Sequence, residues 1–320
     1  MVYLDILFIF VKSLVSMCVT RGRLAHRSWR SELLFRFLKS LFSASKKQPI
    51  TWLRDRQEAL NSPDEKHKVR FENEHIQGVD CLWCKPNTST TASTIIVYFH
   101  GGGYVFGSTA SYKNVFTELA LASNAWVLGV DYRLGPEHHF PAAQDDCLAV
   151  SQHILDQYCD FRVILAGDSA GGGLVLDSHN SLLERGVPSK PAALLLISPW
   201  LDPANQLASM SGNEHTDVLD RQLVEQWRQL YMGDTPTDHP RVNFRDMPCQ
   251  GLVPIYIQAA SDEIFIDQIR AFSKRVQAAG VSVRLDEYAG LFHDFQVLTP
   301  LLPEAKQALA DIGRYVKGSE

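Results

Sequence analysis

The stretch RVILAGDSAGGGLVL, residues 162–176, decides how the rest of the chain is interpreted. Its first part, Arg162 to Ala166, is a short apolar run bounded by a turn signal, which is typical of a buried strand. Glycines follow, and they tolerate the backbone angles of a tight turn. The residues after 170 continue as a helical pattern. The sequence therefore predicts a strand, a sharp turn and a helix, with Ser169 at the apex of the turn.

Ser169 stands within Gly167-Asp168-Ser169-Ala170-Gly171, a G-x-S-x-G element. A serine hydroxyl is a weak nucleophile until a base accepts its proton, and a strand-to-helix turn lifts it into reach of such a base. The alternative is a chance match in a helix-capping turn. The strand on one side and the helix on the other favour the nucleophile.

A second glycine-rich element, His100-Gly101-Gly102-Gly103, follows the predicted strand that ends at Phe99. Consecutive glycines let backbone N–H groups point into a site, as the stabilisation of an oxyanion requires. We expect the N–H groups of Gly102, Gly103 and Ala170 to form this oxyanion hole. No Lys-Ser/Thr pair follows, so a phosphate-binding P-loop is not predicted.

The base and its orienting acid should follow the nucleophile in the order Ser, Asp, His. His293 comes just after the last predicted strand, where a loop could carry it back over the turn. For the acid we expect Asp262, which follows the predicted strand 254–259 and would emerge at the carboxyl edge of the sheet. Glu263 and Asp267 are its neighbouring rivals, although Asp267 is better placed to cap a helix.

Short β-rich runs and helical stretches alternate from about residue 66 onward, which predicts an α/β fold with a mainly parallel sheet and helices on both faces. The predicted strands span residues 94–99, 125–131, 162–166, 193–198, 254–259 and 281–288. The predicted helices span residues 111–122, 142–158, 170–185, 267–279 and 303–317.

Two stretches interrupt this rhythm, namely a helical N-terminal region and a region near residue 200 that holds a helix at 217–232. Ligands of open α/β sheets bind beyond the carboxyl ends of the strands, where inserted helices would form a cap. We therefore predict an N-terminal helical cap segment (1–60), a catalytic domain (61–199 and 249–320) and a cap insertion (200–248).

The first twenty residues are apolar but interrupted, so a membrane-spanning helix is disfavoured. On a helical projection, polar residues form one narrow stripe opposite a broad apolar face: Asp5, Lys12, Ser13, Ser16 and Thr20. Two interpretations remain, a lid over an apolar pocket, which we favour, and an interfacial helix in peripheral membrane contact through residues 1–20. No secretion signal is evident, so a cytoplasmic location is expected.

Charge is unevenly distributed along the chain. The net charge of −5 gives no sign of a nucleic-acid partner, but residues 1–70 hold 14 Lys+Arg against 6 Asp+Glu, whereas residues 71–320 hold 17 against 30. The six cysteines are too few for a disulfide framework, so free thiols are expected. Cys81-x-x-Cys84 lacks a second Cys/His pair, and we predict neither a metal nor a cofactor.

Taken together, the motifs resemble those of the hormone-sensitive-lipase-like family of esterases. They are His-Gly-Gly-Gly-Tyr at 100–104, the DYRLGPE segment at 131–137 with FPAA at 140–143, Gly-Asp-Ser-Ala-Gly-Gly at 167–172, and the Asp262 and His293 segments. The resemblance implies an α/β-hydrolase fold, a cap built from the N-terminus and an insertion, and esterase activity without a cofactor. The family's Asp-Pro-Leu reads Asp262-Glu263-Ile264 here, a departure that resembles the fungal branch.

The expected function is that of a serine carboxylesterase acting on a small hydrophobic ester with a short acyl or acetyl group, and the fungal likeness implies a place in secondary metabolism. Residues expected to line the pocket are Tyr104, Trp200, Leu201, Trp227, Tyr231 and Phe292. Two alternatives stay open: an amide or formamide deacylase that uses the same residues, and a non-catalytic small-molecule binding protein on a hydrolase scaffold. The partner is a small-molecule ester, and the oligomeric state is not predicted.

Overall fold

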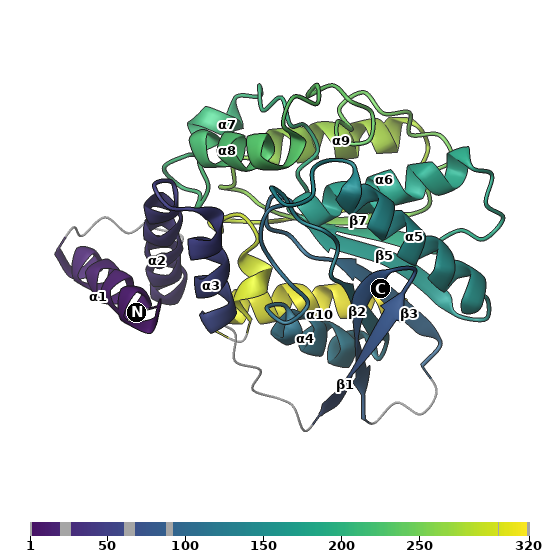
Figure 1. Ribbon diagram of the computed structural model, residues 1–320, viewed down its shortest axis with the longest axis horizontal. Helices are drawn as coiled ribbons and strands as arrows, with labels where there is room; N and C mark the ends of the chain where they lie inside the picture. The colour runs from purple at the N-terminus through teal and green to yellow at the C-terminus, as the bar shows by residue number, and fades with distance from the viewer. Residues whose placement is uncertain (1, 20–26, 61–67, 88–91, 300, 319–320) are drawn as a thin grey trace.

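A central sheet of eight strands organises the molecule (Figure 1). The computed structural model describes residues 2–19, 27–60, 68–87, 92–299 and 301–318. The strand order is β1-β2-β4-β3-β5-β6-β7-β8, in which β2 runs antiparallel to both of its neighbours and all pairs from β4 to β8 are parallel. The strands are β1 (Val69–Ile76), β2 (Val79–Pro86), β3 (Thr94–Phe99), β4 (Trp126–Val130), β5 (Arg162–Asp168), β6 (Ala193–Ile197), β7 (Ile255–Ala260) and β8 (Val283–Tyr288).

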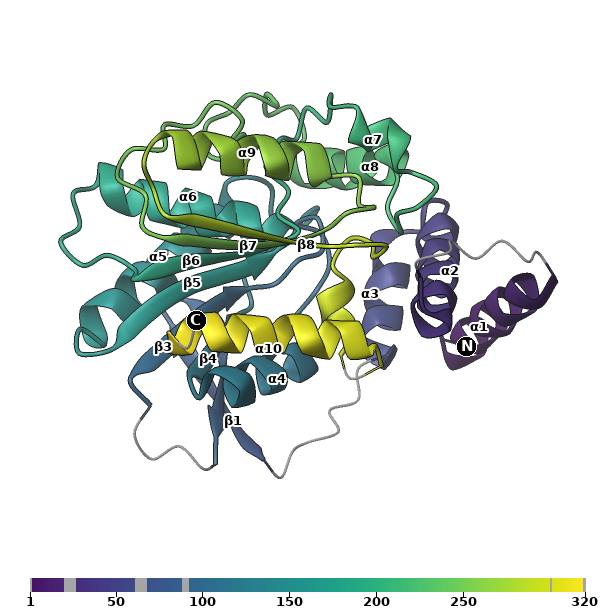
Figure 2. The same ribbon diagram turned by 180° about the vertical axis from the view of Figure 1, so that it is seen from behind.

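Helices cover both faces of this sheet, as the alternation of the sequence predicted. Figure 2 shows α4 and α10 on one face and α5, α6 and α9 on the other. Their bounds are α4 (Lys113–Ser123), α5 (Ala142–Gln157), α6 (Ala170–Glu184), α9 (Ile266–Ala278) and α10 (Pro303–Lys317). Because both faces are covered, the inner strands are apolar at almost every position, and β3, β5, β6 and β7 are almost entirely buried. The α/β-hydrolase fold expected from the sequence is therefore confirmed.

The remaining helices lie at the carboxyl end of the parallel strands. Those of the N-terminal segment, α1 (Val2–Val19), α2 (Trp29–Ser45) and α3 (Ile50–Leu60), form one group beside the body of the molecule (Figures 1 and 2). Two more, α7 (Ser209–Gly212) and α8 (Arg221–Met232), belong to the stretch between β6 and β7, and a 3-10 turn (Phe295–Leu298) precedes α10. The division into cap and catalytic domain stays an interpretation.

Helix α8 begins four residues later than the predicted helix at 217–232. Asp220 is its N-cap, with the side chain accepting a hydrogen bond from the N–H of Leu223 at 3.0 Å. Asp217 is thereby left outside the helix, in a buried loop. The sequence places two aspartates close together, and the choice between them as the cap depends on tertiary contacts.

One half-buried lysine joins the two groups of cap helices. Lys39 of α2 donates hydrogen bonds from Nζ to the carbonyl oxygens of Glu214, Asp217 and Leu219, at 2.6, 2.7 and 3.1 Å. These three bonds saturate the ammonium group. Burial lowers the pKa of Lys39, while the nearby charge of Asp217 opposes that shift.

The Cys81 and Cys84 side chains of β2 belong to the two different core clusters, one on each face of the sheet. Residues three apart on a strand point to opposite faces, so these two thiols cannot bind one metal ion together. Burial raises the pKa of both thiols to about 12. They are core residues, and all six cysteines are free thiols.

We predict that Lys39→Met lowers the free energy of unfolding by about 2–4 kcal/mol, because three partly buried carbonyl groups lose their shared donor. Lys47→Met is the matched control, since Lys47 is exposed just beyond the end of α2 and its loss should cost less than about 0.5 kcal/mol. Urea denaturation of both variants measures the difference. Equal stability of the two variants would contradict the role given to Lys39.

Candidate active site

The turn between β5 and α6 has the sharp geometry that its glycines predicted. Ser169 lies at φ 50° and ψ −118°, outside the regions that most residues favour. A Cβ atom at Gly171 would lie 2.0 Å from the carbonyl oxygen of Phe99, and one at Gly167 would lie 2.5 Å from the backbone of Gly171. Only glycine fits at these two positions, since β3, β5 and α6 approach one another too closely for a side chain.

Ser169 and His293 meet as the sequence predicted. The Nε2 atom of His293 lies 2.9 Å from the Oγ atom of Ser169, a hydrogen-bond distance for a base beside its nucleophile. Both side chains are largely buried. His293 comes from the loop after β8, where its backbone N–H donates to Oδ1 of Asp217 at 2.9 Å.

Asp294 also approaches the imidazole, with its Oδ2 atom 3.0 Å from Nε2 of His293. Its backbone is left-handed at φ 53°, which turns the side chain towards the site. Burial raises the pKa of Asp294 well above its ordinary value, and that of the neighbouring Asp168 too.

The glycine-rich loop lies beside the serine. Gly102 and Gly103 have φ angles of 117° and 58°, and both line the same cavity as Ser169 and His293. A Cβ atom at Gly103 would lie 2.7 Å from the indole of Trp227. Ala170, the third residue expected in the oxyanion hole, follows Ser169 as the first residue of α6. The residues expected to hold an oxyanion therefore lie next to the nucleophile.

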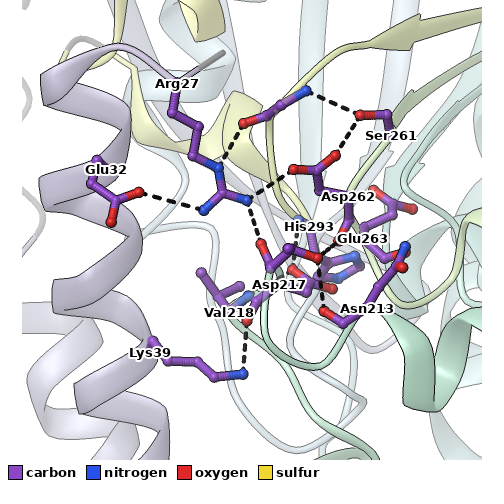
Figure 3. A network of polar contacts seen from close by, with 12 residues as sticks. Arg27, Glu32, Lys39, Asn213, Asp217, Val218, Ser261, Asp262, Glu263 and His293 are labelled. Carbon is purple, nitrogen blue, oxygen red and sulfur yellow. Dashed lines mark hydrogen bonds and ion pairs between the residues drawn. The ribbon is translucent and has the colours of Figure 1, made fainter. Parts of the chain in front are cut away.

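Asp262 does not orient the imidazole in this structure. Its Oδ2 atom accepts a hydrogen bond from Arg27 at 3.3 Å, and its Oδ1 atom accepts one from Ser261 at 2.7 Å (Figure 3). The Nδ1 atom of His293, which an orienting acid would bind, is buried and makes no hydrogen bond. A buried cation from the N-terminal segment thus attracts the carboxylate that the sequence assigned to His293.

Glu263 is a further carboxyl group that lies buried in the site. Its Oε2 atom accepts hydrogen bonds from Oγ of Ser198 at 2.6 Å and from the N–H of Ala260 at 3.1 Å. Its Oε1 atom is buried and, like Nδ1 of His293, has no hydrogen-bond partner. Burial raises the pKa of Glu263 to about 8, and the charge of His293 is the strongest influence that opposes this rise.

Sequence reasoning missed Asp217, whose side chain binds the backbone of two loops, the one that carries His293 and the one that carries Glu263. Besides the N–H of His293, its carboxylate accepts hydrogen bonds from the N–H groups of Val218 and Ile264, each at 2.7 Å. Ile264 follows Glu263 directly, so one buried side chain holds the histidine loop and the acid loop together. No local signal marks Asp217, because its partners are 47 and 76 residues away.

Arg27 was missed for the same reason. Its fully buried guanidinium donates to the carbonyl oxygen of Gly290 at 2.8 Å, to that of Thr216, and to Asp262 (Figure 3). The ring of Phe35 lies 4.3 Å from the guanidinium carbon. Burial lowers the pKa of Arg27, while the charge of Asp262 opposes that shift. Arg27 therefore joins the loops that carry Asp217, Asp262 and His293.

A cavity of about 480 Å³ opens above Ser169 and His293. Most of its wall is apolar, and a large part comes from helices α2 and α3: Leu34, Phe37, Leu38, Leu41, Phe42, Leu53 and Leu60. Helix α1 contributes none of the lining residues. The lid expected of residues 1–20 is therefore supplied by the two helices that follow α1.

Of the six side chains expected to line the pocket, Trp227 does so. The structure places the other five in the surrounding core. Tyr104 stacks on Tyr231 with ring centroids 4.7 Å apart, and Trp200 stacks on Phe265 at 5.9 Å. Leu201 and Phe292 are likewise buried in the core. These five residues therefore belong to the core and not to the lining of the cavity.

A nucleophilic serine on a strand-to-helix turn, with a histidine at hydrogen-bond distance, is the arrangement of a serine hydrolase. A family model described as the alpha/beta hydrolase fold matches residues 96–297. An acetyl-hydrolase of Streptomyces hygroscopicus is 34% identical over 237 residues, covering 73% of this chain and 78% of the relative. An esterase of Acinetobacter venetianus is also 34% identical, over 231 residues, covering 70% and 75% respectively.

Solved structures agree with these sequence relatives. The crystal structure of an esterase from the bacterial hormone-sensitive lipase family matches with a TM-score of 0.83 and 31% identity, covering 91% of this chain and 98% of that one. This chain belongs to the hormone-sensitive lipase family of α/β-hydrolases and is a serine esterase that acts on carboxylic esters. The relatives named here are bacterial, so the expected likeness to the fungal branch gains no support.

No helix in the described ranges is both long and apolar enough to cross a membrane.

We predict that Arg27→Met lowers kcat for a soluble ester by about tenfold or more and leaves KM within about twofold, since small displacements of catalytic groups are costly. Arg27→Lys should recover part of the loss because it keeps the charge. Arg30→Met, which changes an exposed arginine of α2, is the matched control. If Arg27→Met lowers the melting temperature but keeps the wild-type kcat, Arg27 only stabilises the fold.

Proposed function

We propose that this esterase hydrolyses small hydrophobic esters with short acyl groups, acetyl esters among them, through a covalent acyl-enzyme on Ser169. The observation that carries the proposal is the 2.9 Å contact between Ser169 and His293 at the base of a mostly apolar cavity. A mostly apolar cavity of about 480 Å³ has room for a small hydrophobic ester. The similarity to an acetyl-hydrolase supports the same substrate class.

In the proposed mechanism, His293 accepts the proton of Ser169 as the serine oxygen attacks the ester carbonyl. The negative charge that develops on the carbonyl oxygen is stabilised by the N–H groups of Gly102, Gly103 and Ala170. The imidazolium then protonates the departing alcohol. In the second half, His293 activates a water molecule, which releases the acid and restores the serine.

We further propose Glu263, rather than Asp262, as the acid that orients His293. Two complementary buried atoms support this, because Nδ1 of His293 can donate a hydrogen bond, Oε1 of Glu263 can accept one, and neither has a partner. Their charges also attract each other. Asp262 keeps a separate role as the acceptor of Arg27. The proposed order of the residues along the chain, Ser, acid, His, is the one expected of this fold.

Glu263→Gln and Asp262→Asn distinguish these two acids. We expect Glu263→Gln to lower kcat by about 100-fold or more, because the imidazolium loses its balancing charge, and to change the pH profile of kcat/KM. Asp262→Asn should lower kcat by no more than about tenfold and keep the wild-type pH profile. The measurement is steady-state hydrolysis of a soluble ester from pH 6 to 9. The reverse ranking of the two variants would restore Asp262 as the orienting acid.

Acyl-chain preference tests the substrate class. We expect hydrolysis of p-nitrophenyl esters to be fastest for acetyl and butyryl groups, to fall steeply by dodecanoyl, and to be lost in Ser169→Ala. A matched amide series addresses the deacylase alternative, which would be favoured if kcat/KM for the amide equalled that for the ester. Turnover of no ester at all, with tight binding of a small hydrophobic ligand, would instead favour the binding-protein alternative.

The place in secondary metabolism and the cytoplasmic location remain predictions from the sequence.

A further inference from the structure

Helix α1 packs against its neighbours with its polar side inward, the reverse of an ordinary surface helix. Asp5 forms an ion pair with Arg56 of α3. The hydroxyl of Ser16 accepts a hydrogen bond from Nη1 of Arg36 in α2 at 2.9 Å, and the buried Ser13 donates to the carbonyl oxygen of Ile9 at 2.8 Å. Three residues of the polar stripe noted in the sequence, Asp5, Ser13 and Ser16, are therefore directed at the protein, whereas Lys12 is exposed and Thr20 lies outside the described residues.

The opposite face of α1 is apolar and exposed to solvent. Its large side chains retain much of their accessible surface: Tyr3 72%, Leu4 70%, Leu7 57%, Phe8 70%, Phe10 37%, Val11 47%, Leu14 39% and Val15 56%. At 100° per residue these eight positions fall within an arc of about 160° that contains no charged residue. A contiguous apolar surface of this kind marks an interaction site.

The charges around this face favour an anionic partner. The acidic residue of α1, Asp5, is turned inward and neutralised by Arg56. Lys12 is exposed next to the apolar arc. Electrostatic attraction to anionic lipids strengthens the binding of such a helix to a bilayer.

The size and place of the face favour a bilayer over a second protein. Stable protein interfaces use about 20–30 residues a side, and this face offers eight. Helix α1 is the outermost helix of the cap group in both views, with α2 and α3 between it and the body (Figures 1 and 2). A single projecting helix can lie flat in the boundary between headgroups and acyl chains, where its whole apolar arc is covered.

We propose that α1 is a membrane-binding helix, which lies along the surface of an anionic lipid bilayer with Leu4, Leu7, Phe8 and Val11 directed into the apolar boundary. Ion pairs and hydrogen bonds to α2 and α3 hold α1 on the cap, so the cap and not the acidic body would face the lipid. The helices next to α1 line the active-site cavity, which would therefore open near lipid-dissolved esters.

The test uses the full chain and vesicles of phosphatidylcholine, with and without added phosphatidylglycerol, in a co-sedimentation assay. We compare the wild type with Leu7→Gln/Val11→Gln and with the matched control Leu7→Met/Val11→Met, which keeps the face apolar. We expect the wild type and the Met pair to bind the anionic vesicles, and the Gln pair to bind at least about tenfold more weakly. Hydrolysis of a soluble ester should be the same in all three proteins, and binding should strengthen with phosphatidylglycerol.

Three outcomes would overturn the proposal. One is failure of the folded, active wild type to sediment with either vesicle. Another is binding that the Gln pair does not weaken or that phosphatidylglycerol does not strengthen. The third is a lipid-free dimer, seen by sedimentation velocity, that the Gln pair but not the Met pair dissociates, since this would assign the face to a second copy of the chain. None of these outcomes would contradict the proposed esterase activity, because hydrolysis of a soluble ester measures that activity independently of vesicle binding.

Discussion

The close approach of β3, β5 and α6 around Ser169 is the constraint on which the site depends. With no room for a side chain at Gly167 or Gly171, the backbone turns sharply enough to hold the serine clear of the sheet. Backbone hydrogen bonds hold Ser169 in this positive-φ conformation, because its N–H donates to the carbonyl oxygen of Ile197 in β6 at 2.9 Å and its own carbonyl accepts from the N–H of Trp200 at 2.9 Å. The nucleophile is thereby fixed by three neighbouring strands before any other group approaches it.

Around this fixed serine, the other catalytic loops are held by basic residues of the N-terminal segment. Arg27 binds the histidine and acid loops, and Lys39 binds the loop that carries Asp217. Arg54 of α3 donates to the carbonyl oxygen of Val105, next to the glycine-rich loop, and forms an ion pair with Glu137. The basic character of the first seventy residues thus has a structural use within the molecule, apart from any partner outside it.

Local signals were enough for the six strands from β3 to β8, for the turn and for the pairing of Ser169 with His293, because each depends on residues adjacent in sequence or on chain order. The antiparallel strands β1 and β2 were not among the predicted strands. The orienting acid was harder to assign from the sequence, because Asp262 and Glu263 are neighbours. Asp262 binds Arg27, which is 235 residues away in the chain, and no local pattern indicates this contact. The inward polar stripe of α1 could not be foreseen either. A helical pattern shows that two faces differ, but the fold decides which of them is covered.

Arg27, Lys39 and Arg54, which hold the catalytic loops, donate mostly to backbone carbonyl oxygens. A carbonyl acceptor is present whichever side chain a residue carries, so the loops at 214–219 and 290 can exchange their exposed side chains and remain attached. The donors lack that freedom, because shortening Arg27 or Lys39 by one methylene would break several bonds at once. Substitutions that change the substrate range can therefore accumulate in these loops. Arg27 and Lys39, in contrast, are positions where a library of variants would tolerate few replacements.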